Sequence, residues 1–202
     1  LPWRPEEQGV ARMFCDVHTP ERKPYEGDPR QVLRRTLDRM HSLGFDDFAV
    51  GPELEFYLFK DAVGTEVLDK GGYFDLTTLD AGSDLRRETV LALEELGIHV
   101  EYTHHEVGPS QHEIDMRYES ALKMADNCMT YRITVKEYAM KNGYHATFMC
   151  RPRIPNVVSS GWHLHQSLIA RKGGRNAFAS DGKTPLSMLG MHYLGGLLTH
   201  AA

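Results

Sequence analysis

Two glutamates lie two residues apart in an otherwise apolar stretch, GPELEFYLF, at residues 51–59. Because side chains alternate between the two faces of a β-strand, Glu53 and Glu55 would share one face, and the leucine and phenylalanine side chains beside them would face a core. Two carboxylates held this close repel each other, and burying them costs free energy unless a partner compensates the charge. The spacing therefore indicates either a solvated sheet face or a cation-binding site.

Two further segments carry groups of the same kind. Glu106 and Glu113 flank a turn-like sequence, and His163 and His165 alternate in the strand-like stretch 162–169. Taken singly, a glutamate pair around a turn is usually surface charge, and an H-x-H pair is usually incidental. Taken together and set among apolar neighbours, four glutamates and a histidine form a hard, oxygen-rich ligand set that suits Mg²⁺ or Mn²⁺. No cysteine lies near them in the sequence, which argues against zinc.

A cluster of divalent cations suits phosphoryl transfer, because the cations hold and neutralise phosphate groups. The chain contains neither a G-x-G-x-x-G nor a G-x-x-x-x-G-K-[ST] loop, so neither of the usual phosphate-binding loops is present. The sequence therefore favours a carboxylate-metal site over a glycine-rich loop as the place where phosphates would bind.

Composition narrows the class of protein. The chain has 202 residues, is 41% hydrophobic and 25% charged, and has a net charge of -5, which fits a folded domain and argues against a nucleic-acid-binding surface. It has no apolar run long enough to cross a membrane. Its three cysteines form no C-x-x-C pair, which argues against a disulfide framework and favours the reducing cytoplasm.

The secondary-structure pattern predicts an α+β fold. Helices are expected over 28–44, about 83–96 and about 119–142 and from about 185, and strands over 10–19, 48–59, 98–107, 111–118, 145–152 and 162–169. Neighbouring strands joined by turns favour antiparallel pairing, and the irregular order of helices and strands does not fit a doubly wound parallel sheet. We expect a mostly antiparallel sheet with flanking helices.

Five motifs then carry a family resemblance: GPELEFYLF, GGYFDL, HHEVGPSQHEID, ATFM and GWHLHQSL. Their order and spacing resemble the glutamine synthetase family, in its bacterial type I branch, from about Val10 to His200. The resemblance implies the curved antiparallel sheet of that family's catalytic domain, here incomplete. It also implies an ATP-dependent carbon–nitrogen ligase that makes glutamine from glutamate and ammonia through γ-glutamyl phosphate.

The resemblance also implies roles for individual residues. Two or more Mg²⁺ or Mn²⁺ ions would be bound, the first by Glu55, Glu106 and Glu113 and the second by Glu53 and His163. ATP, as a substrate, would be contacted by Glu101, His104, Tyr118, His165 and Ser167. The amino-acid substrate would be contacted by Ser159 and Gly161.

One motif departs from the family pattern. Members commonly carry Asn-Gly-Ser-Gly-Met before the metal-binding histidine, where this chain has valine at 158 and a bulky ring at Trp162. An amide that could hydrogen-bond a substrate is missing, so a γ-glutamyl-amine ligase acting on a polyamine or alkylamine stands as an alternative. A non-catalytic relative and a metal-dependent hydrolase are weaker alternatives, because all five metal-binding positions and the motif order are retained.

The resemblance finally implies domain limits and partners. Residues 1–20 are expected to be the last strand of an N-terminal β-grasp domain and a linker, and residues 21–202 the N-terminal portion of the catalytic domain. We expect the chain to be a piece of a longer protein, inactive alone, that forms a ring-type homo-oligomer and binds neither nucleic acid nor a membrane.

Overall fold

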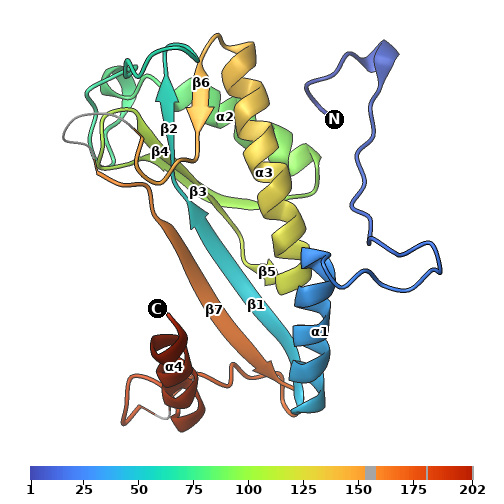
Figure 1. The fold of residues 1–202 in the computed structure, drawn as a ribbon. Coiled ribbons are helices and arrows are strands. Elements are labelled where there is room, and N and C mark those ends of the chain that lie inside the picture. The colour runs from blue at the N-terminus through green and yellow to red at the C-terminus, as the bar shows by residue number, and fades with distance from the viewer. Residues whose placement is uncertain (153–157, 181, 202) are drawn as a thin grey trace. The chain divides into compact units, whose positions relative to one another are not determined.

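The computed structural model of the protein describes residues 1–152, 158–180 and 182–201 (Figure 1). Two short 3₁₀ helices are present, η1 (Glu6–Gln8) and η2 (Thr77–Leu79). The α-helices are α1 (Pro29–Ser42), α2 (Ser83–Glu95), α3 (Ala121–Lys141) and α4 (Met188–His200). The strands are β1 (Phe45–Leu54), β2 (Phe56–Phe59), β3 (Val100–His105), β4 (Gln111–Met116), β5 (Glu119–Ser120), β6 (His145–Thr147) and β7 (Trp162–Ala170).

The chain folds into two compact units. The first comprises Leu1–Phe14, Gly51–Tyr118 and Ala125–Leu164, and the second comprises Cys15–Val50, Glu119–Met124 and His165–Ala202. The first unit contains a four-stranded sheet in the order β3-β4-β2-β6, in which every neighbouring pair is antiparallel. The predicted α+β fold with antiparallel pairing and flanking helices is therefore confirmed.

Helices α2 and α3 and the strands together supply the buried apolar residues of the first unit. On α3, Tyr131, Val135 and Ala139 recur at intervals of four residues and are fully buried, which is the pattern of one helix face against a core. The Tyr131 hydroxyl donates a hydrogen bond of 3.1 Å to the carbonyl of Leu54, at the end of β1. Helix α3 therefore anchors the strand that carries Glu53.

The second unit shows how local sequence sets the helix ends. The Asp28 carboxylate accepts a hydrogen bond of 3.0 Å from the backbone N–H of Arg30, and Pro29 occupies the first turn of α1, as expected for an N-cap. Gly44, with φ of 94°, follows the last turn. A three-stranded sheet in the order β5-β1-β7 completes the strand pairing.

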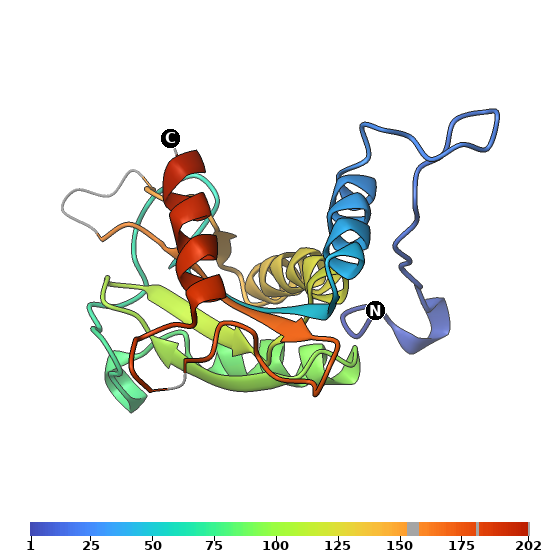
Figure 2. The ribbon, with the colours of Figure 1, turned by 90° about the horizontal axis from the view of Figure 1, so that it is seen from below.

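Two predicted strands are wrong or too long. Residues 10–17, all of them described, form no strand; the region contains only an isolated bridge between His18 and Pro24 (Figure 2). A strand needs a continuous ladder of backbone hydrogen bonds, and within the described residues this stretch has only single bonds, such as that from the Tyr25 N–H to the Val17 carbonyl. Its apolar residues stay exposed, as Met13 does at 82%. Strand β6 likewise has three residues, not the eight predicted over 145–152. The assignment of residues 1–20 to a β-grasp domain stays a prediction.

Among the residues that the structure describes, no helix combines the length and the apolar character needed to cross a bilayer.

A buried ionic network ties α2 to the β3–β4 hairpin. The Arg86 guanidinium forms two hydrogen bonds with the Asp80 carboxylate, at 2.8 and 2.6 Å, and a third of 2.8 Å with Thr103 on β3. It also donates to Nδ1 of His112 on β4 at 2.8 Å. Burial, and next the neighbouring positive charge of Arg86, lowers the pKa of His112 to about 3, so this imidazole is neutral and can accept that bond.

This network generates a stability prediction. The Arg86→Met variant should lose about 3–5 kcal/mol of unfolding free energy, because it leaves the Asp80 carboxylate buried without its partner. The double variant Arg86→Met/Asp80→Leu should recover most of the loss, because both charges are then removed. Arg87→Met, at the exposed position next to Arg86, is the control and should stay within about 0.5 kcal/mol of the wild type. Thermal and urea unfolding measure all three, and equal effects of Arg86→Met and Arg87→Met would contradict the prediction.

Candidate functional site

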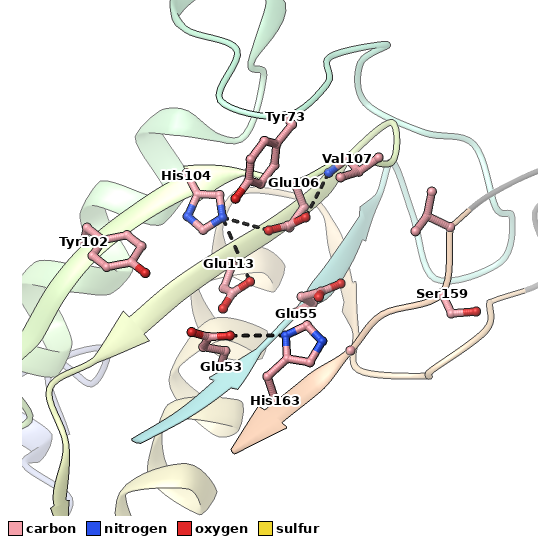
Figure 3. Close-up of a pocket in the computed structure, with 12 residues that line it drawn as sticks. Glu53, Glu55, Tyr73, Tyr102, His104, Glu106, Val107, Glu113, Ser159 and His163 are labelled. Atoms are coloured by element: carbon pink, nitrogen blue, oxygen red, sulfur yellow. Dashed lines mark hydrogen bonds and ion pairs between the residues drawn. The ribbon is translucent and has the colours of Figure 1, made fainter. Parts of the chain in front are cut away.

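The first unit contains a cavity of about 420 Å³ with an acidic wall (Figure 3). Its charged and imidazole lining consists of Glu53, Glu55, Glu106, Glu113, His104 and His163. The remaining lining residues are Tyr73, Tyr102, Val107, Val158, Ser159 and Gly161. All five predicted metal-binding residues therefore meet in one cavity, although they come from four separate strands or strand ends.

Glu53 and Glu55 face this cavity together, as their spacing predicts (Figure 3). The strand is interrupted at Glu55 itself, because β1 ends at Leu54 and β2 begins at Phe56. The Glu55 carboxylate accepts a hydrogen bond of 2.5 Å from the Gln111 amide. Burial raises the pKa of Glu55, against the lowering effect of a hydrogen bond from the Gly161 backbone. Glu55 is therefore held in place by neutral donors, and these contacts include no lysine or arginine.

The β3–β4 hairpin supplies the opposite wall. Its register places His104 across from Glu113 and Tyr102 across from Asp115. His104 Nε2 lies 2.7 Å from Oε1 of Glu106 and 4.0 Å from Oε2 of Glu113, so the imidazole sits between two carboxylates (Figure 3). The cross-strand pairing thus brings residues from two strands and the turn between them into one cluster.

Glu113 experiences the strongest electrostatic crowding. Burial, and next the neighbouring Asp115 carboxyl group, raises the pKa of Glu113 to about 10. Burial also raises the pKa of Asp115. A carboxyl group in such surroundings keeps a proton at neutral pH unless a cation takes its place. His104, Glu106 and Glu113 offer ligand atoms within 4.8 Å of one another, so the residues present fit a divalent cation.

His163 approaches from β7. Its Nδ1 lies 3.1 Å from Oε2 of Glu53, and the N–H donates to the carboxylate (Figure 3). This bond leaves Nε2 as the nitrogen that can ligate a cation. A Cβ atom at Gly161 would come within 2.8 Å of Oε1 of Glu55 and 2.9 Å of Nε2 of His163, so a side chain there would displace one of these two groups.

An aromatic pair covers His104. The Phe74 ring stacks on the imidazole with 4.6 Å between ring centroids, and Tyr73 meets it edge-on at 5.6 Å. Phe74 has φ of 60°, a left-handed conformation that is rare for a bulky residue and costs on the order of 1–3 kcal/mol. The backbone N–H of Phe74 donates a hydrogen bond of 3.0 Å to the carbonyl of His105. The strained turn thus places Tyr73 at the cavity wall.

The turn between Glu106 and Glu113 rests on a second buried pair. Both His105 ring nitrogens face acceptors: Nε2 lies 3.0 Å from Oδ1 of Asp69, and Nδ1 lies 2.7 Å from the carbonyl of Glu106. Burial alone would lower the pKa of His105, but the hydrogen bond and charge of Asp69 raise it, so the imidazolium form is favoured. The Asp69 carboxylate also accepts a hydrogen bond of 2.9 Å from the backbone N–H of Ser110, inside the turn.

Not every predicted site residue lines the cavity. Ser159, Gly161 and His104 do, whereas Glu101 and Tyr118 belong to the same unit but lie outside the described lining. His165 and Ser167 belong to the second unit, where the Ser167 hydroxyl accepts a hydrogen bond of 3.2 Å from the side-chain amide of Asn176. Their predicted contacts with ATP stay predictions.

The structure also corrects and extends the sequence-based site. Trp162 is not among the residues that line the acidic cavity. It lines a smaller cavity of about 120 Å³ next to it, together with Leu54 and Phe148, and the two cavities share Glu55 and Gly161. Tyr73, Tyr102 and Val107 were not predicted as lining residues. Gln111 and Asp115 were missed too, although they alternate with Glu113 along β4 and therefore share its face.

Comparisons with known proteins identify the family. The family model described as "Glutamine synthetase, catalytic domain" matches residues 26–202. The glutamine synthetase of Thermotoga maritima is 46% identical over 206 residues, covering 100% of this chain and 46% of the relative. That of Methanosarcina mazei is 48% identical over 205 residues, covering 99% of this chain and 45% of the relative. The chain thus spans a little under half the length of the curated relatives it matches.

Solved structures agree. One described as "Apo GmaS without ligand" superposes with a TM-score of 0.83 at 30% identity, over 92% of this chain and 44% of the other. A structure described as "CryoEM Plasmodium falciparum glutamine synthetase" gives a TM-score of 0.80 at 26% identity, over 93% of this chain and 43% of the other. Because the family model matches well over half of the sequence, the chain belongs to the glutamine synthetase catalytic-domain family.

Proposed function

We propose that the protein carrying this chain is an ATP-dependent ligase that joins ammonia to the γ-carboxylate of glutamate through γ-glutamyl phosphate. The observation that carries the proposal is the convergence of Glu53, Glu55, Glu106, Glu113 and His163 on one cavity in a chain of this family. The curated relatives at 46–48% identity bear the name glutamine synthetase, which supports the same activity.

We assign two divalent cations, Mg²⁺ or Mn²⁺, to these side chains. Glu55, Glu106 and Glu113 would hold the first, and Glu53 and His163 would contribute to the second. Cations bound there would neutralise phosphate charge and so assist transfer of the terminal phosphoryl group of ATP.

The chain's own contacts preorganise these ligands. The Gln111 amide fixes one oxygen of Glu55, and His104 Nε2 fixes one oxygen of Glu106, so each carboxylate is held in one orientation. The Val107 backbone N–H donates a hydrogen bond of 3.0 Å to the second carboxylate oxygen of Glu106. A site held this way needs little rearrangement when substrates bind, which is the main source of electrostatic catalysis.

The remaining assignments follow from the family and belong to the same proposal. ATP would be contacted by Glu101, His104, Tyr118, His165 and Ser167, and the amino acid by Ser159 and Gly161. Residues 1–20 would close an N-terminal β-grasp domain, and residues 21–202 would begin the catalytic domain. The full-length protein would form a ring-type homo-oligomer in the cytoplasm.

A γ-glutamyl-amine ligase is the second candidate, because Val158 stands at the cavity wall where family members commonly have asparagine. The backbone carbonyl of Val158 accepts a hydrogen bond of 2.6 Å from the hydroxyl of Tyr57, which holds this apolar residue at the rim. An apolar rim would suit the alkyl part of a larger amine better than it would suit ammonia. The likeness to the structure described as "Apo GmaS without ligand" is compatible with either candidate, because it reports the shared fold.

Metal binding tests the ligand assignment without turnover. In the full-length protein, Glu55→Gln should weaken Mn²⁺ binding at least about tenfold, because a charged ligand becomes a neutral amide. Glu21→Gln, at an exposed loop position, is the control with the same chemical change. Titration of metal-free protein with Mn²⁺, followed by electron paramagnetic resonance, measures both; unchanged affinity in Glu55→Gln would refute the assignment.

Substrate choice separates the two candidate functions. With glutamate, ATP and Mg²⁺ or Mn²⁺, we expect kcat/KM for ammonia to exceed that for methylamine, ethylamine and putrescine by about tenfold or more in the full-length protein. The measurement is ADP release for each amine. Preference for a larger amine would instead establish the γ-glutamyl-amine ligase, and Val158→Asn should then shift the preference back toward ammonia.

A further inference from the structure

Asp69 joins segments that lie far apart in the sequence. Its side chain is 7% exposed, and its Oδ1 accepts hydrogen bonds from the His105 imidazole, at 3.0 Å, and from the backbone N–H of Ser110, at 2.9 Å. Its Oδ2 accepts a hydrogen bond of 2.9 Å from the backbone N–H of Ala81. One buried carboxylate therefore connects the loop between β2 and α2, residues 60–82, to the end of β3 and to the turn that follows it.

Ser110 bonds to the same loop in the opposite direction. Its hydroxyl oxygen accepts hydrogen bonds from the backbone N–H groups of Leu68, at 2.6 Å, and of Asp69, at 3.0 Å. Ser110 is fully buried and has φ of 58°, in the left-handed region where glycine is the favoured residue. A glycine would suit this backbone better but would lack the hydroxyl group. The hydrogen bonds to the loop therefore give a physical reason for a serine here.

His105 links Asp69 to the cavity wall. Its imidazole is fully buried between the Asp69 carboxylate and the carbonyl of Glu106, which lies 2.7 Å from Nδ1. The carbonyl of His105 accepts the bond from the N–H of Phe74, the residue after Tyr73. The same residue thus holds the main chain of a proposed metal ligand and the loop that carries Tyr73, and both line the cavity (Figure 3).

This buried group is not arranged to bind a cation of its own. Asp69, Asp80, His105 and His112 offer ligand atoms within 4.8 Å of one another. Both oxygens of Asp80 bind the Arg86 guanidinium, however, and this positive charge would repel a cation. The oxygens of Asp69 already accept the hydrogen bonds described above. The arrangement therefore favours a role in holding the chain in place.

We propose that Asp69 is a positioning residue for the metal cavity. Through His105 and Ser110 it would fix the main chain of Glu106 and of the turn after it, and it would hold the loop 60–82 against them. Asp69 is not among the residues that line the cavity, so it would touch neither cation nor substrate. The inference rests on the proposed metal role of Glu106. A carboxylate on a well-fixed main chain binds a cation more tightly than one that must be ordered on binding, so Asp69 would set the affinity for the first cation.

The first test measures metal affinity in the full-length protein. Asp69→Asn keeps the size of the side chain but removes its charge and one acceptor oxygen. Titration of metal-free protein with Mn²⁺, followed by electron paramagnetic resonance at a temperature where every variant is folded, should show binding weakened about fivefold or more. Asp61→Asn is the matched control and should equal the wild type, because this exposed carboxylate of the same loop accepts hydrogen bonds only from the nearby N–H groups of Val63 and Gly64.

A second control separates positioning from a general loss of stability. Val135→Ala, at a fully buried position on α3, should lower the melting temperature but leave Mn²⁺ affinity within about twofold of the wild type. Equal weakening of Mn²⁺ binding in Val135→Ala and Asp69→Asn would show that any destabilisation has this effect, and would overturn the inference.

Hydrogen exchange of the metal-free protein tests the connection itself. In Asp69→Asn, the backbone amides of 68–74 and of 106–111 should both exchange about tenfold faster, whereas those of α3 should not change. Faster exchange in only one of the two segments would contradict a connection between them. Ser110→Gly suits the left-handed backbone and keeps its N–H, so it is the variant that decides if Asp69→Asn does not fold; both segments should again exchange faster, and Mn²⁺ binding should weaken.

The outcomes distinguish this inference from the proposed function. Unchanged Mn²⁺ affinity in a folded Asp69→Asn variant would overturn the positioning role alone, and the metal ligands would still be tested through Glu55→Gln. A wild-type protein that binds no Mn²⁺ would overturn the metal assignment, and this inference with it.

Discussion

Repulsion between carboxylates is the constraint on which the first unit depends. Glu53, Glu55, Glu106, Glu113 and Asp115 converge on or beside one cavity, and no lysine or arginine of the described residues lines it. Two unit charges 4 Å apart at a surface-like effective dielectric constant of about 20 repel by roughly 4 kcal/mol, so several such pairs rival the whole stability of a domain. The fold can keep the carboxylates together only because protons or bound cations reduce their charge and the scaffold resists their separation.

The protein counters this repulsion with ionic groups that lie on the opposite face of the acidic strands. Along β4, residues alternate between Glu113, which faces the cavity, and His112, which faces Arg86 on α2. Arg86 therefore binds the β3–β4 hairpin through His112 and Thr103, on the face opposite the cavity. Asp69 binds His105, at the start of the turn between β3 and β4. A positive group inside the cavity would cancel the field that attracts a metal ion, whereas the same group behind the sheet stabilises the strands and leaves that field in place.

Periodicity predicted which residues share a face but not which faces meet. The two-residue spacing correctly placed Glu53 beside Glu55, because alternation is a local property of a strand. The register that sets His104 opposite Glu113 depends on how two strands slide past each other, and a sequence of alternating residues does not fix it. Alternation along β4 could have placed Asp115 on the face of Glu113, but its closeness to Glu53, 62 residues earlier in the chain, depends on how the strands come together. The strand expected over 10–19 failed similarly, since pairing requires a partner that local sequence does not supply.

The cavity has two parts that differ in residue type: buried carboxylates, which could bind cations, and an uncharged, exposed rim. The carboxylates that could hold cations are largely buried, fixed by Gln111, His104 and backbone donors, and sensitive to any change of charge. Val158 and Ser159, at the rim, are exposed and make no ionic contact within the described residues. A change at the rim would therefore alter the shape and polarity of the cavity mouth without changing the charge balance among the carboxylates. Under the proposed function, this separation would allow one metal-binding arrangement to be kept while the residue at position 158 changes the polarity of the rim.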